Sequence, residues 1–159
     1  MQDLNTAQLE DNQRACLASL LDILIPALES KGMLAAGALG IAGFVEARMQ
    51  DTQRFSAIVL DVLSRIEALL SNAGVGALAD IAPAERVALV RNVEAQQPLA
   101  FLTFLTQVYL GYYTHPSIPP KFGLPDRPPQ PLGHKLPEDE NLEELLAPVR
   151  GRGPLFRPC

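Results

Sequence analysis

Apolar residues recur every three or four positions through residues 9–114, which is the spacing that places them on one face of an α-helix. The clearest example covers residues 52–71, where charged residues occupy the opposite face. Its apolar stripe consists of Phe55, Ile58, Val59, Val62, Ile66, Leu69 and Leu70. On the polar face, Asp61 and Arg65 have the spacing that allows an ion pair between adjacent turns. The pattern predicts a long amphipathic helix, which ends near Gly74.

Similar spacing predicts three more helices around this one. Leucines predict a first helix, for which Asn5 and Thr6 supply the N-terminal cap and Pro26 marks the end. A second helix is expected over residues 38–50, and Pro83 suits the first turn of a fourth. We expect these helices to pack together as a bundle.

Glycines stand at every third position around the start of the second helix, at Gly37, Gly40 and Gly43. Their order does not match a phosphate-binding loop, and no strand precedes them. We interpret them as a helix surface kept bare so that another backbone can approach, at a cost of about 1 kcal/mol per glycine relative to alanine.

A fifth helix is predicted from Pro98 to about Thr114, and it differs from the others because it has almost no polar face. Its apolar residues are Leu99, Phe101, Leu102, Phe104, Leu105, Val108, Tyr109, Leu110, Tyr112 and Tyr113. A helix that is apolar all round is expected to be buried on every side. We therefore place it at the centre of the domain or of an interface, with Tyr112 or Tyr113 as candidates for contact with a partner.

Prolines gather in the last part of the chain, where residues 115–159 hold 11 of the 14. They favour extended polyproline geometry. One short helix is predicted over residues 138–146, where Leu142, Leu145 and Leu146 have helical spacing and Pro148 ends the pattern. The prediction is an all-α protein: a helical bundle of about five helices over residues 1–114, followed by an extended proline-rich arm over residues 115–159.

The arm carries many apolar side chains between its prolines. Ordering a chain costs about 1 kcal/mol per residue or more, whereas burial of each large apolar side chain contributes about 1.5–3 kcal/mol. The two sums are comparable, so the arm is expected to order only against a surface, either the helical body or a partner. The residues that we expect at an interface with a partner are Phe104, Tyr109, Tyr112, Tyr113, Ile118, Phe122, Leu124, Leu132, Leu155 and Phe156.

The net charge of −5 argues against nucleic acid and against an anionic membrane surface as partners. No segment has the length and composition of a membrane span. Cys16 and Cys159 form neither a disulfide framework nor a zinc pattern. The first residues carry no export signal. The sequence as written therefore predicts a cytoplasmic protein, or a periplasmic one if its N-terminus has been trimmed.

Residues with the capacity for catalysis are sparse. His115 and His134 are the two histidines of the chain, and a metal or general-base site needs further ligands held rigidly around them. The simpler interpretation is that His115 closes the fifth helix and His134 is an exposed loop residue. No dinucleotide fingerprint or haem-attachment motif is present. We predict no catalytic, cofactor-binding or metal-binding residue in this chain.

Four short motifs follow one another from the fifth helix into the arm. They are Phe101-x-x-Phe104-Leu105, Gly111-Tyr-Tyr113-x-x-Pro116, Phe122-Gly123 and Pro129-x-Pro131-x-Gly133. Earlier, residues 20–26 and then Phe44-Val45 on a following helix complete the arrangement. Over roughly residues 17–153 the chain resembles the gluconate 2-dehydrogenase subunit 3 family.

This resemblance implies a small, non-catalytic subunit. Members of the family accompany a large flavoprotein of the glucose-methanol-choline type, which holds FAD and oxidises sugars, sugar acids or polyols; some complexes add a cytochrome c subunit. The small subunit supports folding, stability or export of the large one. The chain is then expected to bind and stabilise the FAD-containing subunit of a sugar, glycoside or polyol dehydrogenase. Exported members carry a twin-arginine signal, which Met1-Gln-Asp-Leu4 does not match.

Two alternatives remain open from the residues alone. The chain could be a free-standing helical binding protein whose arm closes over its own ligand pocket. It could also be an enzyme in its own right that uses His115 and His134 around a metal ion.

Overall fold

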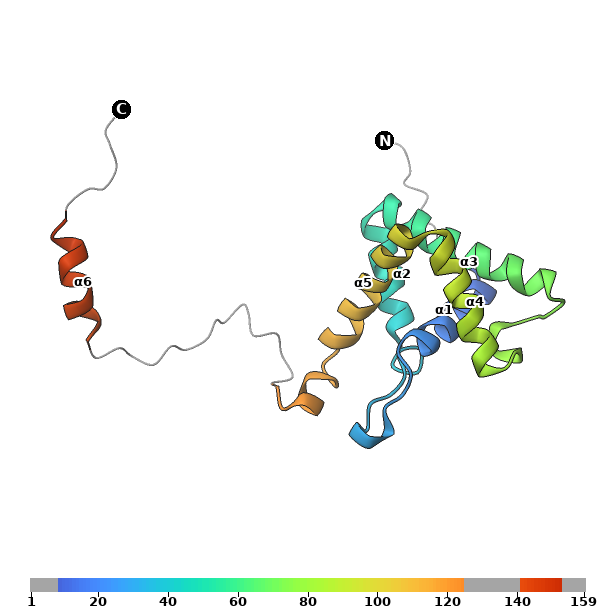
Figure 1. The fold of residues 1–159 in the computed structure, drawn as a ribbon, viewed down its shortest axis with the longest axis horizontal. Helices are drawn as coiled ribbons and strands as arrows, with labels where there is room; N and C mark the ends of the chain where they lie inside the picture. The colour runs from blue at the N-terminus through green and yellow to red at the C-terminus, as the bar shows by residue number, and fades with distance from the viewer. Residues whose placement is uncertain (1–8, 125–140, 153–159) are drawn as a thin grey trace, which may run out of the picture. The chain divides into compact units, whose positions relative to one another are not determined.

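Two compact units divide the chain, Met1–Arg127 and Pro128–Cys159. The structure is a computed structural model that describes residues 9–124 and 141–152 (Figure 1). Within these residues it contains helices and no strands, apart from one isolated bridge between Leu28 and Met33. The predicted all-α fold is confirmed.

The first helix, α1, spans Asp11–Leu24 and begins later than predicted. Glu10 caps it: its side chain accepts a hydrogen bond from the backbone of Gln13, and its own N–H donates to Gln13 Oε1 at 3.1 Å. The prediction that Asn5 and Thr6 supply the cap was wrong, because this reciprocal pair closes the helix end instead. Asn5 and Thr6 themselves lie outside the described residues.

A long connection with a 3₁₀ turn at Glu29–Lys31 leads from α1 to α2, which spans Ile41–Asp51. Asp22 Oδ1 accepts a hydrogen bond of 2.7 Å from the N–H of Gly37. A Cβ at Gly37 would lie 2.3 Å from the carbonyl oxygen of Ala18, so two backbones do approach closely at this glycine, before α2 begins; at Gly43, inside α2, a Cβ would meet no atom within 4 Å, and the predicted close approach is not found there. Gly40 serves a different purpose: it starts α2 with a φ of 81°, a conformation that favours glycine.

The longest helix, α3, spans Gln53–Asn72 and contacts α1, α2, α4 and α5. Thr52 caps it by accepting a hydrogen bond of 3.4 Å from the N–H of Phe55. A short 3₁₀ turn, Leu78–Asp80, precedes α4, which spans Pro83–Gln96 with proline in its first turn as predicted. These elements surround one apolar core.

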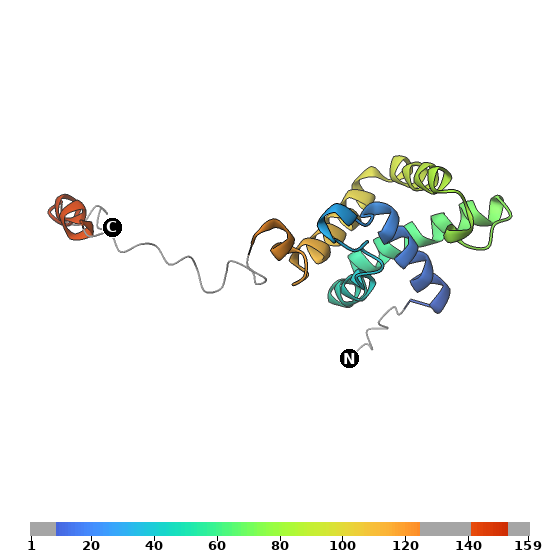
Figure 2. The same cartoon turned by 90° about the horizontal axis from the view of Figure 1, so that it is seen from below.

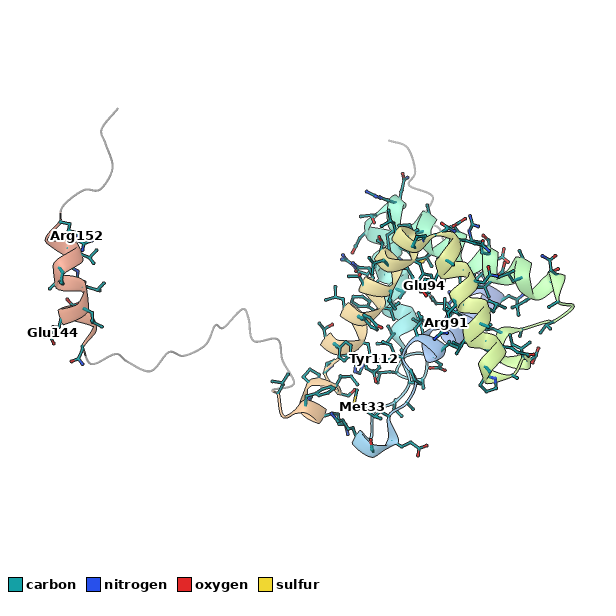
Figure 3. All side chains as sticks on the ribbon, in the orientation of Figure 1. Met33, Arg91, Glu94, Tyr112, Glu144 and Arg152 are labelled. Atoms are coloured by element: carbon teal, nitrogen blue, oxygen red, sulfur yellow. The ribbon has the colours of Figure 1, made fainter. Side chains whose placement is uncertain are left out.

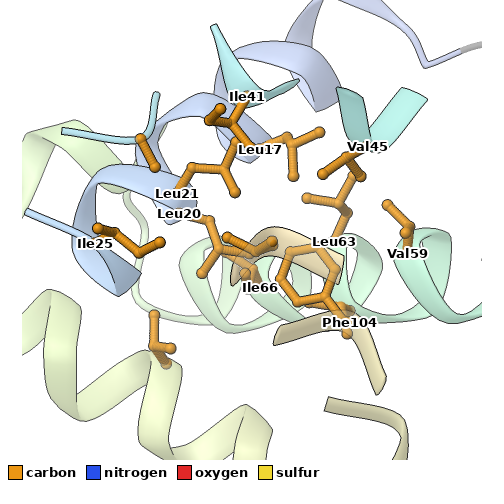
Figure 4. Packing of buried hydrophobic residues seen from close by; sticks show 14 of the residues in the cluster. Leu17, Leu20, Leu21, Ile25, Ile41, Val45, Val59, Leu63, Ile66 and Phe104 are labelled. Carbon is orange, nitrogen blue, oxygen red and sulfur yellow. The ribbon is translucent and has the colours of Figure 1, made fainter. Parts of the chain in front are cut away.

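The core gathers one face of each helix in the first unit (Figure 4). Its residues with no exposed surface are Leu17, Leu20, Leu21, Ala36, Val45, Val59, Leu63, Ile66, Val93, Phe104, Val108 and Tyr112. Phe104 reaches the core from α5 and lies beside α3 residues such as Ile66 (Figure 4). The predicted stripe of α3 supplies much of the contact, so the amphipathic pattern positions this helix correctly.

Helix α5 spans Pro98–Thr114, as predicted, and packs against α2, α3 and α4 (Figures 1 and 2). Its buried residues are Phe101, Phe104, Val108, Gly111 and Tyr112. The prediction that α5 is buried on every side was wrong. No element among residues 9–124 covers its opposite face, where Leu99 is 80% exposed and Leu102 is 57% exposed.

After α5 the chain continues to pack on the first unit. The N–H of Ile118 donates to His115 O at 2.9 Å, and Ile118 is only 2% exposed. A 3₁₀ turn, Pro119–Phe122, follows. The predicted domain boundary after Thr114 therefore falls inside this unit, and residues 115–124 belong to the body, because Ile118 finds an apolar site there.

The second unit contains helix α6, Leu142–Arg150. Pro148 lies inside this helix and does not end it, contrary to the prediction. Proline removes one backbone donor, but the next turn still closes, because the N–H of Gly151 donates to Ala147 O at 3.0 Å. Glu143 forms an ion pair with Arg150, about two turns further along the helix, with the nearest atoms 2.5 Å apart.

Candidate partner-binding surface

The exposed side of α5 forms a continuous apolar strip, which we call the α5 outer face. It comprises Leu99, Leu102, Thr106, Tyr109, Leu110 and Tyr113, which recur at spacings of three and four residues. Its large apolar side chains are 42–80% exposed. A strip of this kind on a folded body marks an interaction surface more often than an ordinary solvated face.

The threonine hydroxyl groups of α5 form their hydrogen bonds within the helix itself. The hydroxyl groups of Thr103, Thr106 and Thr114 each donate to the backbone carbonyl four residues earlier, at 2.9, 2.7 and 2.6 Å. Each hydroxyl group therefore has an acceptor within the helix and needs none from water or a partner. No Asp, Glu, Lys or Arg occurs from Ala95 to Pro120. The α5 outer face is therefore exposed to water without any charged side chain.

Aromatic rings extend the α5 outer face towards the residues that follow the helix. The ring of Tyr113 lies 6.1 Å from that of Tyr109 and 6.5 Å from that of Phe122. The ammonium group of Lys31 lies 4.5 Å above the ring of Phe122. Leu124, beyond the turn, is 60% exposed. The surface therefore continues from α5 onto residues 119–124.

Four of the residues that the sequence predicted at a partner interface lie on this extended surface and are exposed: Tyr109, Tyr113, Phe122 and Leu124. Three others are corrected, because the structure buries Phe104, Tyr112 and Ile118 in the core of this chain. The remaining three, Leu132, Leu155 and Phe156, lie outside the described residues. The predicted interface residues did not include Leu99, Leu102 and Leu110, which the structure leaves exposed on the same face.

The burial of Tyr112 has a clear cause. Its hydroxyl group donates a hydrogen bond of 2.7 Å to Leu34 O, so the polar end of the side chain is satisfied inside the protein. Burial raises the pKa of this phenol above its ordinary value. Figure 3 labels Tyr112 on α5 and Met33, the neighbour of Leu34 in the loop that precedes α2. Tyr112 thus ties α5 to that loop, while Tyr109 and Tyr113 point outward.

Groups that could take part in chemistry are separated in the described part of the chain. No group of three His, Cys, Asp or Glu side chains among residues 9–124 and 141–152 could hold a metal ion. His115 follows α5, with Nδ1 2.9 Å from Ser117 Oγ, and His134 lies outside these ranges. Burial raises the pKa of the Cys16 thiol to about 11, so it is protonated at neutral pH.

Helix α5 is the most apolar helix of the first unit, but its length is limited. At ~1.5 Å per residue its 17 residues extend about 26 Å, less than the ~30 Å thickness of a bilayer core. Among the helices of residues 9–124 and 141–152, none combines the length and hydrophobicity that a membrane crossing needs. The α5 outer face is one side of a helix whose other side belongs to a core.

The chain matches the family model described as gluconate 2-dehydrogenase subunit 3 over residues 11–119. The match begins at the first residue of α1 and ends at the start of the 3₁₀ turn after α5. It therefore covers the five-helix body and the α5 outer face. The motifs from Phe122 onward lie beyond it. No curated protein and no solved structure matches the chain.

Proposed function

Since the chain belongs to the gluconate 2-dehydrogenase subunit 3 family, we propose that it is the small, non-catalytic subunit of a dehydrogenase complex acting on a sugar, glycoside or polyol. In this role it binds and stabilises a large flavoprotein subunit of the glucose-methanol-choline type. FAD in that subunit supplies the redox chemistry. The residues of this chain cover apolar surface on the partner.

The α5 outer face is the observation that supports this proposal most strongly. Leu99, Leu102 and Leu110 are each about half exposed or more. Completing the burial of each contributes about 1–2 kcal/mol, because full burial of a leucine contributes about 1.5–3 kcal/mol. No described element of this chain buries these three side chains, and burial against a partner surface explains why they are apolar.

The same magnitudes show that α5 cannot form the whole interface. Association costs about 4–15 kcal/mol in lost freedom, which is comparable to the gain from the three leucines and two tyrosines together. An obligate complex buries about 2,000 Å² or more. The interface must therefore extend beyond α5, first onto Phe122 and Leu124, which are exposed beside it.

Co-expression with the large flavoprotein subunit tests the proposal. We expect the two chains to purify together and the flavoprotein to lose solubility or FAD occupancy when the small subunit is omitted. The double variant Leu102→Gln, Leu110→Gln should weaken the complex by about 2–4 kcal/mol, or ~30- to 1,000-fold in Kd. Val87→Gln is the matched control, since Val87 is 40% exposed but lies on α4.

The thermal unfolding of the variants separates binding from folding. Because Leu102 and Leu110 are already exposed, both outer-face and control variants should keep the wild-type free energy of unfolding to within about 0.5 kcal/mol, the range expected of surface changes. A small subunit that purifies alone as a stable monomer, beside a flavoprotein that is soluble and active without it, contradicts the proposal. That result favours the alternative of a free-standing binding protein.

A further inference from the structure

A groove runs between α3 and α5 along the edge of the α5 outer face. Two neighbouring hollows share Arg54, Ile58 and Thr103 as lining residues, so they form one continuous depression. Phe55 lines one end, and Leu99, which also belongs to the outer face, lines the other. The groove therefore combines apolar and polar lining residues, and through Leu99 it is continuous with the surface that we assign to the partner.

The charges along this groove are balanced except at one position. Arg48 pairs with Asp51 at 2.7 Å, and Arg65 pairs with Asp61 at 3.1 Å. Arg54 is exposed and forms no ion pair or hydrogen bond within residues 9–124 and 141–152. The lining of the groove thus carries one uncompensated positive charge, in a protein whose net charge is −5.

The position of Arg54 is unfavourable for the isolated body. It lies in the first turn of α3, where the helix dipole favours negative side chains, and no acidic residue occupies that turn. No carboxylate of the described body lies within ion-pair distance of its guanidinium group, and Asp61, which lines the same hollow, is paired with Arg65. A carboxylate supplied from outside would interact favourably with both the guanidinium group and the end of the helix.

We propose that the α3–α5 groove receives an amphipathic segment of the flavoprotein, whose carboxylate side chain pairs with Arg54. Apolar side chains of that segment then lie against Phe55 and Ile58, as in other helix-in-groove contacts. A carboxylate is the expected group because the arginine fork binds it in a bidentate manner. The inference rests on the proposed function and adds a second, charge-selective contact beside the uncharged α5 outer face.

Charge reversal at Arg54 tests this contact. Arg54→Glu in the full-length subunit should lower the association rate constant with the flavoprotein by ~10-fold at low salt. An increase from about 50 to 500 mM NaCl should slow association of the wild type but should no longer slow that of Arg54→Glu, because the charge reversal turns the local attraction into a repulsion that salt screens. Arg91→Glu is the matched control: Arg91 is an exposed arginine on α4 (Figure 3), it lines neither hollow, and its reversal changes the net charge equally. Its rate should stay within about twofold of the wild type at the same salt concentration.

The outcomes separate the two proposals. If the wild-type subunit does not bind the flavoprotein, the proposed function fails. If it binds and both reversals have equal rates, the groove contact alone is refuted. If wild-type subunits dimerise and Arg54→Glu abolishes the dimer without affecting flavoprotein binding, the occupant is a second copy and the inference is overturned. Should Arg54→Glu unfold, Arg54→Gln should still reduce the salt dependence, and an unchanged dependence counts against the contact.

Discussion

Replacing Gly111 by alanine tests whether α2 and α5 pack as closely as the structure indicates. A Cβ at Gly111 would lie 2.5 Å from Cδ1 and 2.9 Å from Cγ of Phe44, closer than atoms can approach without movement. Forcing an extra methyl group into such a contact costs about 1–3 kcal/mol. Alanine returns about 1 kcal/mol through its higher helix propensity. We therefore expect a net loss of stability of about 1 kcal/mol.

The matched control is Gly43→Ala on α2, since a Cβ at Gly43 meets no atom within 4 Å. This variant should be stabilised by up to about 1 kcal/mol, because only the propensity effect operates. Urea unfolding followed by circular dichroism measures both changes from the midpoint at constant slope. In a Phe44→Leu background, Gly111→Ala should lose its penalty. An increase in stability of Gly111→Ala in the wild-type background, equal to that of Gly43→Ala, refutes the close α2–α5 contact.

Three further predictions concern single side chains. Tyr112→Phe leaves Leu34 O without its hydrogen-bond donor, so it should lower the unfolding free energy by about 1–3 kcal/mol in a urea titration; an unchanged value contradicts the role of this bond. Because the folded pKa of Cys16 is raised to about 11, its alkylation rate in a Cys159→Ser variant should rise with pH up to that value. Its contribution to stability should be lost as pH rises from about 9 through 11, and alkylation that saturates near pH 9 contradicts this. Hydrogen bonds from Arg65 and Gln97 lower the pKa of Asp61, so its contribution to the free energy of unfolding should be present above about pH 4 and be lost below it. Asp61→Asn should remove this acid dependence and lower the free energy of unfolding by at most about 0.5 kcal/mol at neutral pH.

Much of the fold follows from local sequence patterns. Helix α3 was predicted to within a residue or two because its apolar stripe is regular. The Asp61–Arg65 ion pair was also predicted, since spacing alone determines it on a helix. The bounds of α5 followed from Pro98 and from the residues that end the apolar run.

The side of α5 that faces the core could not be predicted in the same way. Periodicity reports which side of a helix faces water only when polar residues mark that side, and α5 has few polar residues to mark it. The buried side is determined by tertiary fit, chiefly the position of Gly111 against Phe44 and the hydrogen bond of Tyr112 to the loop before α2. For this reason Phe104 and Tyr112 were placed at an interface although they belong to the core.

The start of α1 and the end of α6 were missed for a related reason. Two capping signals compete before α1, and the pair formed by Glu10 and Gln13 prevails, whereas sequence alone does not rank them. Pro148 reads as a stop signal, yet a helix continues through it when the following N–H groups find acceptors.

The nitration pattern of three neighbouring tyrosines tests the central claim most directly. In the free subunit, chemical nitration read by mass spectrometry should modify Tyr109 and Tyr113, which are 42% and 50% exposed, and leave the buried Tyr112 intact. On assembly with the flavoprotein, Tyr109 and Tyr113 should lose their reactivity, with Tyr112 unreactive throughout as the internal control. If Tyr109 and Tyr113 are nitrated equally fast in the assembled complex and in the free subunit, the α5 outer face is not where the partner binds.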